Sequence, residues 1–205
     1  MTPIEFFFDP ACPWTWITSR WVSEVAGPRQ LDVTWRIFSL RFRNKHNPGY
    51  DWIRDELDAQ HRAVRVIEAA RSTHGDAAAG RLYTSFGALI HHDGDGNLDG
   101  LADGIAAAGL PADIIDAGDD PAWDAVIEAS TRRGWDLVGD DAGIPIIVVP
   151  GRPSVFFGPV LSPAPRGQDA VDLWDAFLTL GKYDGVYEIK RSRNVRPIFG
   201  PRPEV

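Results

Sequence analysis

The chain has 205 residues and a formal net charge of −8, from 21 Lys plus Arg against 29 Asp plus Glu. Its composition, with 44% hydrophobic and 24% charged residues, is ordinary for a globular protein and excludes a mainly disordered chain. The negative charge repels phosphate backbones and anionic lipids, so we expect neither nucleic acid nor a membrane as partner. No apolar stretch approaches the ~18 residues of a membrane span, and the start does not resemble a secretory signal. We therefore expect a cytoplasmic protein.

Cys12 is the single cysteine, which excludes an internal disulfide and a cysteine-based zinc cluster. We expect no metal site elsewhere. The acidic run that starts at Asp93 resembles a calcium loop, but Leu98 and Gly104 stand where such a loop needs glycine and glutamate. The open question is whether Cys12 is an inert packing residue or a reactive thiol.

The first 40 residues read as strand, helix and strand. Residues 4–8 form a short apolar β-rich run. From Pro13 onward apolar residues recur at three- and four-residue steps, as in a helix, until Gly27 ends the pattern. Residues 31–38 alternate apolar and polar side chains, as a half-buried strand does. This order predicts a βαβ unit with a parallel strand pair.

The middle of the chain reads as helical and the end as two strands and a helix. Helices are predicted at residues 51–73, 78–91, 98–108, 111–117 and 121–133. Strands are predicted at 144–149 and 154–157, with a turn at 150–153, followed by a helix at 168–181. We therefore predict an α/β fold, a small mixed sheet flanked by helices. Residues 1–40 and 136–205 would form one domain, and residues 41–135 a helical insertion domain.

Cys12 lies between a predicted strand and Pro13, which suits the first position of a helix. Its sulfur would then face the unpaired N–H groups and the positive end of the helix dipole. Those groups favour a thiolate, so the sequence predicts a lowered thiol pKa. Thr15, one helical turn on, cannot close a disulfide, but its hydroxyl can donate a hydrogen bond to the sulfur. Any redox chemistry would thus be monothiol.

Pro145 follows Ile144 at the start of a predicted strand. A cis bond between them would turn the chain and expose the backbone of Ile144, which could pair with an extended thiol or peptide beside Cys12. The alternative is an ordinary trans proline that opens an edge strand, and cis bonds are only ~5–6% of X–Pro bonds. The residues alone leave both states open.

Two further residues are candidates for substrate contact. Trp14 could form an aromatic wall for a flat substrate, and His91 could line a cleft between the insertion and the sheet. Structural roles are expected for Asp9 in a turn, Trp16 and Trp21 in the core, and Arg191, Arg193 and Arg196 on a solvated tail.

The segment Phe8-Asp-Pro-Ala-Cys-Pro-Trp-Thr-Trp-Ile-Thr-Ser-Arg-Trp21 resembles the active-site segment of the actinobacterial mycothiol-dependent nitroreductases, in the DsbA-like branch of the thioredoxin superfamily. That group typically shows Asp-Pro-x-Cys-Pro-Trp-Cys-Trp-x-Thr-Ser-Arg-Trp. The resemblance implies a thioredoxin-like fold, with Cys12 as the nucleophile and Pro145 as the cis-proline. Thr15 stands where the family has its resolving cysteine, and Ile144 replaces a threonine.

The expected function is that of a monothiol thiol-disulfide oxidoreductase. Cys12 would attack a disulfide or a small or aromatic electrophile, with Thr15 stabilising the thiolate. The expected substrate contacts are Pro13, Trp14, Ile144, Pro145 and His91. No tightly bound cofactor is expected; mycothiol, implied by the resemblance, or another low-molecular-weight thiol would be the cosubstrate. A non-redox thiol-binding, transferase-like or isomerase-like protein is the alternative, and a homodimer stays open.

Overall fold

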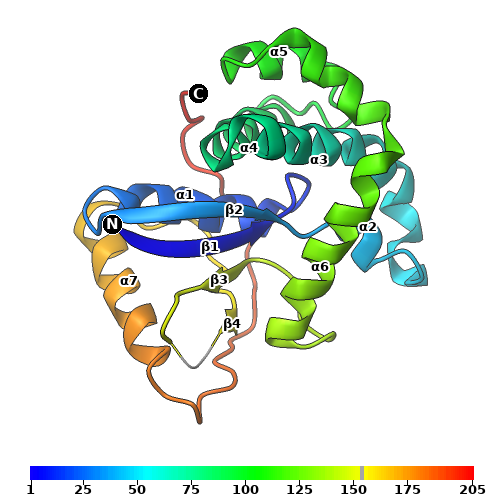
Figure 1. Ribbon diagram of the computed structural model, residues 1–205. Helices are drawn as coiled ribbons and strands as arrows, with labels where there is room; N and C mark the ends of the chain where they lie inside the picture. Colours follow the sequence, from blue (N-terminus) through cyan, green and yellow to red (C-terminus); the bar gives the residue numbers. More distant parts are fainter. Residues whose placement is uncertain (153–154) are drawn as a thin grey trace.

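The computed structural model describes residues 1–152 and 155–205, and its centre is a four-stranded mixed sheet (Figure 1). The sheet order is β2-β1-β3-β4. The strands are β1 (Thr2–Phe8), β2 (Leu31–Ile37), β3 (Ile146–Val148) and β4 (Phe156–Phe157). β1 and β2 are parallel, which confirms the predicted βαβ unit, and β3 pairs antiparallel with both β1 and β4. Pro153 and Ser154, part of the predicted turn and strand, lie outside the described residues.

Two helices pack against each other beside the sheet. Helix α1 (Pro13–Ala26) connects β1 to β2, and α7 (Gly167–Leu180) follows β4. Trp21 on α1 donates its indole N–H to the carbonyl of Ala170 at 2.9 Å, and its ring lies 5.5 Å from that of Trp174. The predicted core position of Trp21 is confirmed, because a buried indole needs such an acceptor.

The chain between β2 and β3 is helical throughout its regular elements, as predicted. Its α-helices are α2 (Leu40–Arg43), α3 (Arg54–His74), α4 (Asp76–His91), α5 (Leu101–Ala107) and α6 (Asp124–Val138). Its 3₁₀ helices are η1 (Pro48–Ile53), η2 (Ala112–Asp119) and η3 (Pro121–Trp123). The predicted helix at 111–117 is therefore a 3₁₀ segment, as is common for short pieces. α2 was not predicted, because four residues are too few to show a period.

Successive phenylalanines of β1 face opposite sides of the sheet. Phe6 and Phe8 pack toward α3 and α4, where the ring of Phe8 lies 3.9 Å from that of Tyr83. Phe7 packs on the other side with Phe38 and Cys12. This alternation, which follows from the two-residue period of a strand, places Cys12 in an apolar cluster of its own. No helix in the described residues has the length and apolarity that crossing a bilayer requires.

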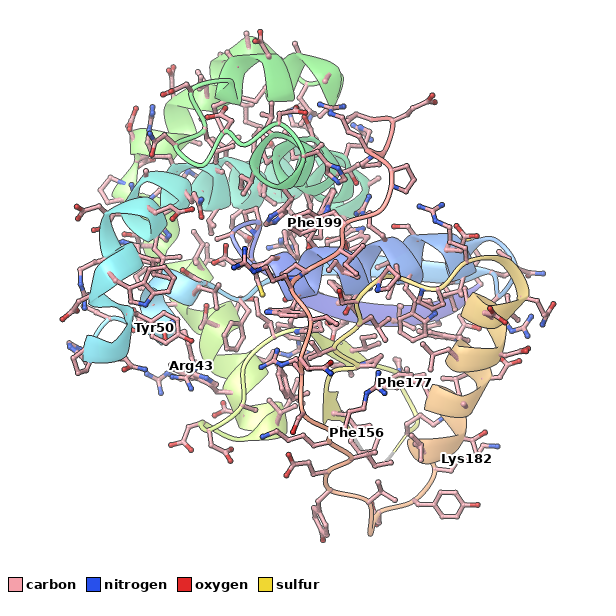
Figure 2. All side chains as sticks on the ribbon, turned by 180° about the vertical axis from the view of Figure 1, so that it is seen from behind. Arg43, Tyr50, Phe156, Phe177, Lys182 and Phe199 are labelled. Carbon is pink, nitrogen blue, oxygen red and sulfur yellow. The ribbon has the colours of Figure 1, made fainter. Side chains whose placement is uncertain are left out.

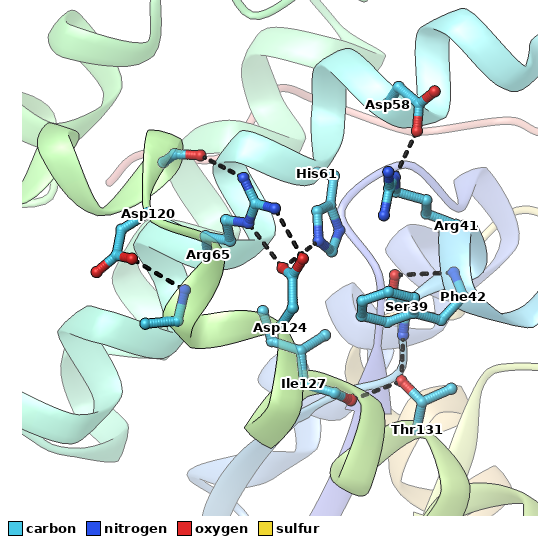
Figure 3. A network of polar contacts seen from close by, with 12 residues as sticks. Ser39, Arg41, Phe42, Asp58, His61, Arg65, Asp120, Asp124, Ile127 and Thr131 are labelled. Carbon is cyan, nitrogen blue, oxygen red and sulfur yellow. Dashed lines mark hydrogen bonds and ion pairs between the residues drawn. The ribbon is translucent and has the colours of Figure 1, made fainter.

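A partly buried ion-pair network joins α3 to α6 (Figure 3). Asp124, the first residue of α6, accepts two hydrogen bonds from Arg65, at 2.7 and 2.8 Å, and lies 2.9 Å from Nε2 of His61. The Arg65 hydrogen bonds, opposed by burial and aided by His61, lower the pKa of Asp124 to about 2. Because the folded pKa lies below the unfolded one, the stabilisation is complete above pH ~4 and is lost as the pH falls toward 2.

We expect Asp124→Asn to lower the free energy of unfolding by about 2 kcal/mol at pH 7, since one pKa unit corresponds to ~1.4 kcal/mol. The deficit should shrink toward pH 2, where the wild-type carboxylate is itself protonated. Urea unfolding at both pH values measures it. Asp119→Asn is the matched control: Asp119 also pairs with an arginine through two bonds of 2.8 Å, but it is 70% exposed and should contribute ~0–1 kcal/mol. Equal effects of the two variants would contradict the prediction.

Candidate active site around the Cys12 thiol

Cys12 occupies the N-cap of α1, as the sequence predicts. Its backbone is extended, with φ −82° and ψ 110°, and Pro13 is the first helical residue. The sulfur accepts a hydrogen bond from the backbone N–H of Thr15 at 3.5 Å. The carbonyl of Cys12 accepts the first helical hydrogen bond, from Trp16 N–H at 2.9 Å. The sulfur therefore acts as the side-chain cap of the helix.

The predicted lowering of the Cys12 pKa is wrong. The residue is only 8% exposed and packs with Phe7, Phe38, Ile144 and Ile146. Burial raises the pKa of the thiol, and the negative charge of the nearby Asp9 raises it further; the Thr15 hydroxyl and backbone N–H oppose this shift without overcoming it. The cost of placing an anion among hydrocarbon side chains outweighs the attraction of the helix amides.

Thr15 is fully buried one turn after Cys12. Its hydroxyl has no hydrogen bond of ordinary geometry among the described residues, yet it lies close enough to the sulfur to lower the pKa of Cys12. The structure thus brings the two predicted catalytic residues together through a backbone hydrogen bond and a weaker side-chain contact.

Asp9 fixes the loop that precedes Cys12. One carboxylate oxygen accepts the N–H of Ala11 at 2.9 Å and the other accepts the N–H of Leu40, at the start of α2, at 2.7 Å. The predicted turn-forming role of Asp9 is confirmed, and the bond to Leu40 also ties the loop to the helical insertion. Burial raises the pKa of Asp9 to about 6.

His91 supports the same loop from α4. Its Nε2 lies 2.8 Å from the carbonyl of Pro10, and burial lowers its pKa to about 4, so a neutral ring donates this hydrogen bond near pH 7. The ring packs between those of Trp16 and Phe199, at centroid distances of 5.7 and 5.1 Å. These contacts place His91 against the backbone two residues before Cys12. Its contact with substrate stays a prediction.

The peptide bond between Ile144 and Pro145 is cis, the state that the residues alone left open. Ile144 is buried in the apolar cluster that contains Cys12, and the carbonyl of Pro145 accepts the N–H of Gly158 at 2.8 Å. The start of β3 thus packs against the thiol side of the sheet, although the two segments are far apart in the sequence. β3 lies between β1 and β4, so it is not an edge strand.

A cavity of about 770 Å³ opens beside Trp14, the half-buried residue two positions after Cys12. Its other walls come from Gly143 in the loop before Pro145, from β4 and the loop after it, from α7, and from residues 186–195 of the C-terminal segment. The guanidinium carbon of Arg193 lies 4.9 Å from the ring centre of Trp14. This contact of Arg193 was not predicted, because nothing periodic in the tail sequence indicates where its side chains lie.

A mixed sheet with a helical insertion, a cysteine at the N-cap of the first helix and a cis-proline before β3 define a DsbA-like protein of the thioredoxin fold. Residues 11–191 match the Rv2466c-like family, described as mycothiol-dependent nitroreductase Rv2466c. The chain belongs to this family, and its single cysteine is Cys12.

The chain is also similar to one curated protein in sequence and to solved structures in fold. The chain is 29% identical over 202 residues to the uncharacterized protein Rv2286c of Mycobacterium tuberculosis (strain ATCC 25618 / H37Rv), covering 95% of this chain and 84% of the relative. Two solved structures show the fold. One is the cytosolic disulfide reductase DsbM from Pseudomonas aeruginosa with GSH (TM-score 0.58, 17% identity, covering 86% of this chain and 99% of DsbM). The other is 2-hydroxychromene-2-carboxylate isomerase (TM-score 0.58, 13% identity, covering 86% and 94%).

Proposed function

We propose that this protein is a monothiol oxidoreductase in which Cys12 exchanges with a low-molecular-weight thiol, mycothiol by family, and passes electrons to a small or aromatic electrophile or disulfide. The observation that carries the proposal is the Cys12 sulfur, which caps α1 through the Thr15 N–H while the chain contains no second cysteine. A monothiol needs an external thiol to complete its cycle, and a reducing cytoplasm would supply one.

The proposed cycle balances with one external thiol for a disulfide substrate and with two for a nitroaromatic. With a disulfide substrate, the Cys12 thiolate forms a bond to one substrate sulfur, the substrate S–S bond breaks, and the other sulfur leaves as a thiol. An external thiol then attacks the substrate sulfur of the mixed disulfide, which regenerates Cys12 and releases a disulfide between the external thiol and that half of the substrate. With a nitroaromatic, Cys12 and one external thiol together supply two electrons and two protons. They form the mixed disulfide while the nitro group becomes a nitroso group and water, and a second external thiol then regenerates Cys12 and leaves as a disulfide with the first.

The raised pKa of Cys12 affects both the rate of its first attack and the lifetime of the mixed disulfide. Few molecules of the free protein carry the thiolate near pH 7, so the first attack is slow in the absence of a bound partner. A thiol with a high pKa is also a poor leaving group, so a mixed disulfide on Cys12 should persist until a thiol in excess releases it. We propose that Thr15 lowers this barrier, and that Pro13, Trp14, Ile144, Pro145 and His91 shape the surface on which the partner binds.

A non-redox function, thiol binding or isomerisation, has one observation in its favour. The same burial that raises the Cys12 pKa would suit a cysteine that only packs, while a bound ligand does the chemistry. The two functions differ in whether Cys12 forms a covalent adduct.

We expect reduced protein mixed with the disulfide of mycothiol to gain one mycothiol on Cys12, measured by intact-mass spectrometry, and to lose it in excess mycothiol. The rate should keep rising with pH beyond ~8.5, the ordinary thiol pKa, because burial holds the folded pKa higher. Cys12→Ser is the control and should form no adduct. A wild-type protein that forms no adduct even at high pH would overturn the redox proposal in favour of non-redox binding.

A further inference from the structure

The cavity beside Trp14 has a size that suits a small ligand. Its volume of about 770 Å³ falls in the ~300–1,000 Å³ range of ligand pockets. Aromatic side chains provide much of its apolar surface; those of Trp14, Phe156, Phe177 and Tyr187 line it. Flat apolar walls of this kind favour a ligand with an aromatic ring.

The charge of the cavity wall contrasts with that of the whole chain. The chain carries a net charge of −8, yet Lys190, Arg191 and Arg193 line this cavity, against the carboxylates of Asp141 and Glu188. In the part of the chain that the structure describes, none of these three cations forms an ion pair. Cations that have no ion-pair partner and lie beside an aromatic wall are complementary to an anionic aromatic ligand.

Arg193 is the cation best placed for such a ligand. Its guanidinium lies over the Trp14 ring at 4.9 Å, a cation–π contact that restricts the side chain. A guanidinium that uses one face for stacking keeps its N–H edge free, and this edge matches a carboxylate through two parallel hydrogen bonds. Trp14 also packs against the apolar cluster that contains Cys12. The bound acid would therefore lie next to this cluster, although Cys12 itself is not among the described residues that line the cavity.

The segment that carries Arg193 is held at several points further along the chain. Ser162 Oγ donates to the carbonyl of Arg196 at 3.1 Å and accepts the N–H of Ile198 at 3.0 Å. Beyond these bonds Phe199 stacks on His91, and Arg202 pairs with Asp93 at 2.8 Å. The segment runs from the end of α7 past β4 to Phe199 and ends beside α4 (Figures 1 and 2). These contacts anchor the segment from Arg196 onward, and the stacking on Trp14 holds Arg193 itself.

We propose that this cavity binds small aromatic acids and that Arg193 selects them by their carboxylate. The inference rests on the proposed function, because it names the class of substrate that Cys12 would meet. Arg193 is a specificity-determining residue: it binds the acid group, while Trp14 and the phenylalanines contact the ring.

Binding of para-nitrobenzoate and its neutral isostere para-nitrobenzamide to the intact protein, measured by calorimetry, tests this proposal. We expect the acid to bind about tenfold more tightly than the amide, because a charge-assisted bidentate pair is stronger than a neutral hydrogen bond. Arg193→Gln should remove that preference, so that the acid and the amide bind equally. Arg196→Gln is the matched control, since Arg196 lies three residues on in the same segment outside the cavity lining, and it should keep the preference.

Three outcomes would each overturn the proposal. They are no binding of the acid, equal affinity of the wild-type protein for acid and amide, and a preference for the acid that survives Arg193→Gln. The assay does not use the thiol, so the two proposals can fail separately. Selective binding without a mycothiol adduct on Cys12 would overturn the redox function and leave the acid site standing. A mycothiol adduct on Cys12 without selective binding of the acid would support the redox function and overturn the acid site.

Discussion

The Thr15→Cys variant should gain an internal disulfide with Cys12 under mild oxidant and, with it, dithiol reductase activity. Thr15 is one helical turn from Cys12, and its backbone nitrogen lies 3.5 Å from the sulfur. The Thr15 hydroxyl is close enough to influence the thiol pKa, so a sulfur in its place would lie next to Sγ of Cys12. Titration of free thiols before and after oxidation measures the bond: the count should fall from two to zero.

Thr15→Ser is the matched control for this variant. It keeps a hydroxyl beside Cys12 and adds no thiol, so one titratable thiol should remain under the same oxidant. Without an external thiol, only the dithiol variant should reduce one equivalent of disulfide substrate completely, because its second thiol can displace the substrate from Cys12 and close the internal disulfide. Two thiols that stay titratable in Thr15→Cys would mean that the first turn of α1 cannot bring the sulfurs together, contrary to the geometry around Cys12.

Replacing Gly87 with alanine should cause the largest loss of stability among simple changes near the site. A Cβ at Gly87 on α4 would lie 2.2 Å from Cζ3 and 2.4 Å from Cε3 of Trp16, which is fully buried on α1. The indole cannot move away, because it packs against Tyr83 and His91 at centroid distances of 5.6 and 5.7 Å. We expect a loss of about 3 kcal/mol, the upper end for overpacking, measured by urea unfolding.

Gly27→Ala is the control, since Gly27 has φ −64° and open space where its Cβ would lie. It should be neutral or slightly stabilising, because alanine restricts the unfolded chain. Combining Gly87→Ala with Trp16→Phe should recover part of the loss, as expected for residues in contact. A neutral Gly87→Ala variant would contradict the tight α1–α4 contact, and with it the support that His91 gives to the loop before Cys12.

Features set by neighbouring residues were predictable from the sequence. The N-cap position of Cys12 follows from Pro13, whose ring fixes φ and suits the first helical turn. The turn at Asp9 follows from the hydrogen bonds that a short carboxylate can make to the next backbone N–H groups. The parallel pair of β1 and β2 follows from the helix that connects them.

Features that depend on distant residues were not predictable. The contact of Gly87 with Trp16 joins two helices, and a pattern within either helix does not reveal the partner. His91 was singled out as a residue that could line a cleft, but only the fold shows that its ring holds the carbonyl of Pro10. Arg193 is exposed, as expected for the tail, but no local signal indicates that its guanidinium lies over Trp14.

The sequence by itself determined that this protein has one thiol at the start of a helix and no cysteine with which to pair it, because backbone geometry around a proline is a local property. Only the tertiary structure decided how easily that thiol ionises. Phe38 and Ile144, which come from other parts of the chain, enclose the sulfur and raise its pKa, reversing the direction that the helix amides alone would give. Desolvation depends on everything that packs around an atom, and residues adjacent in sequence are only a small part of that environment.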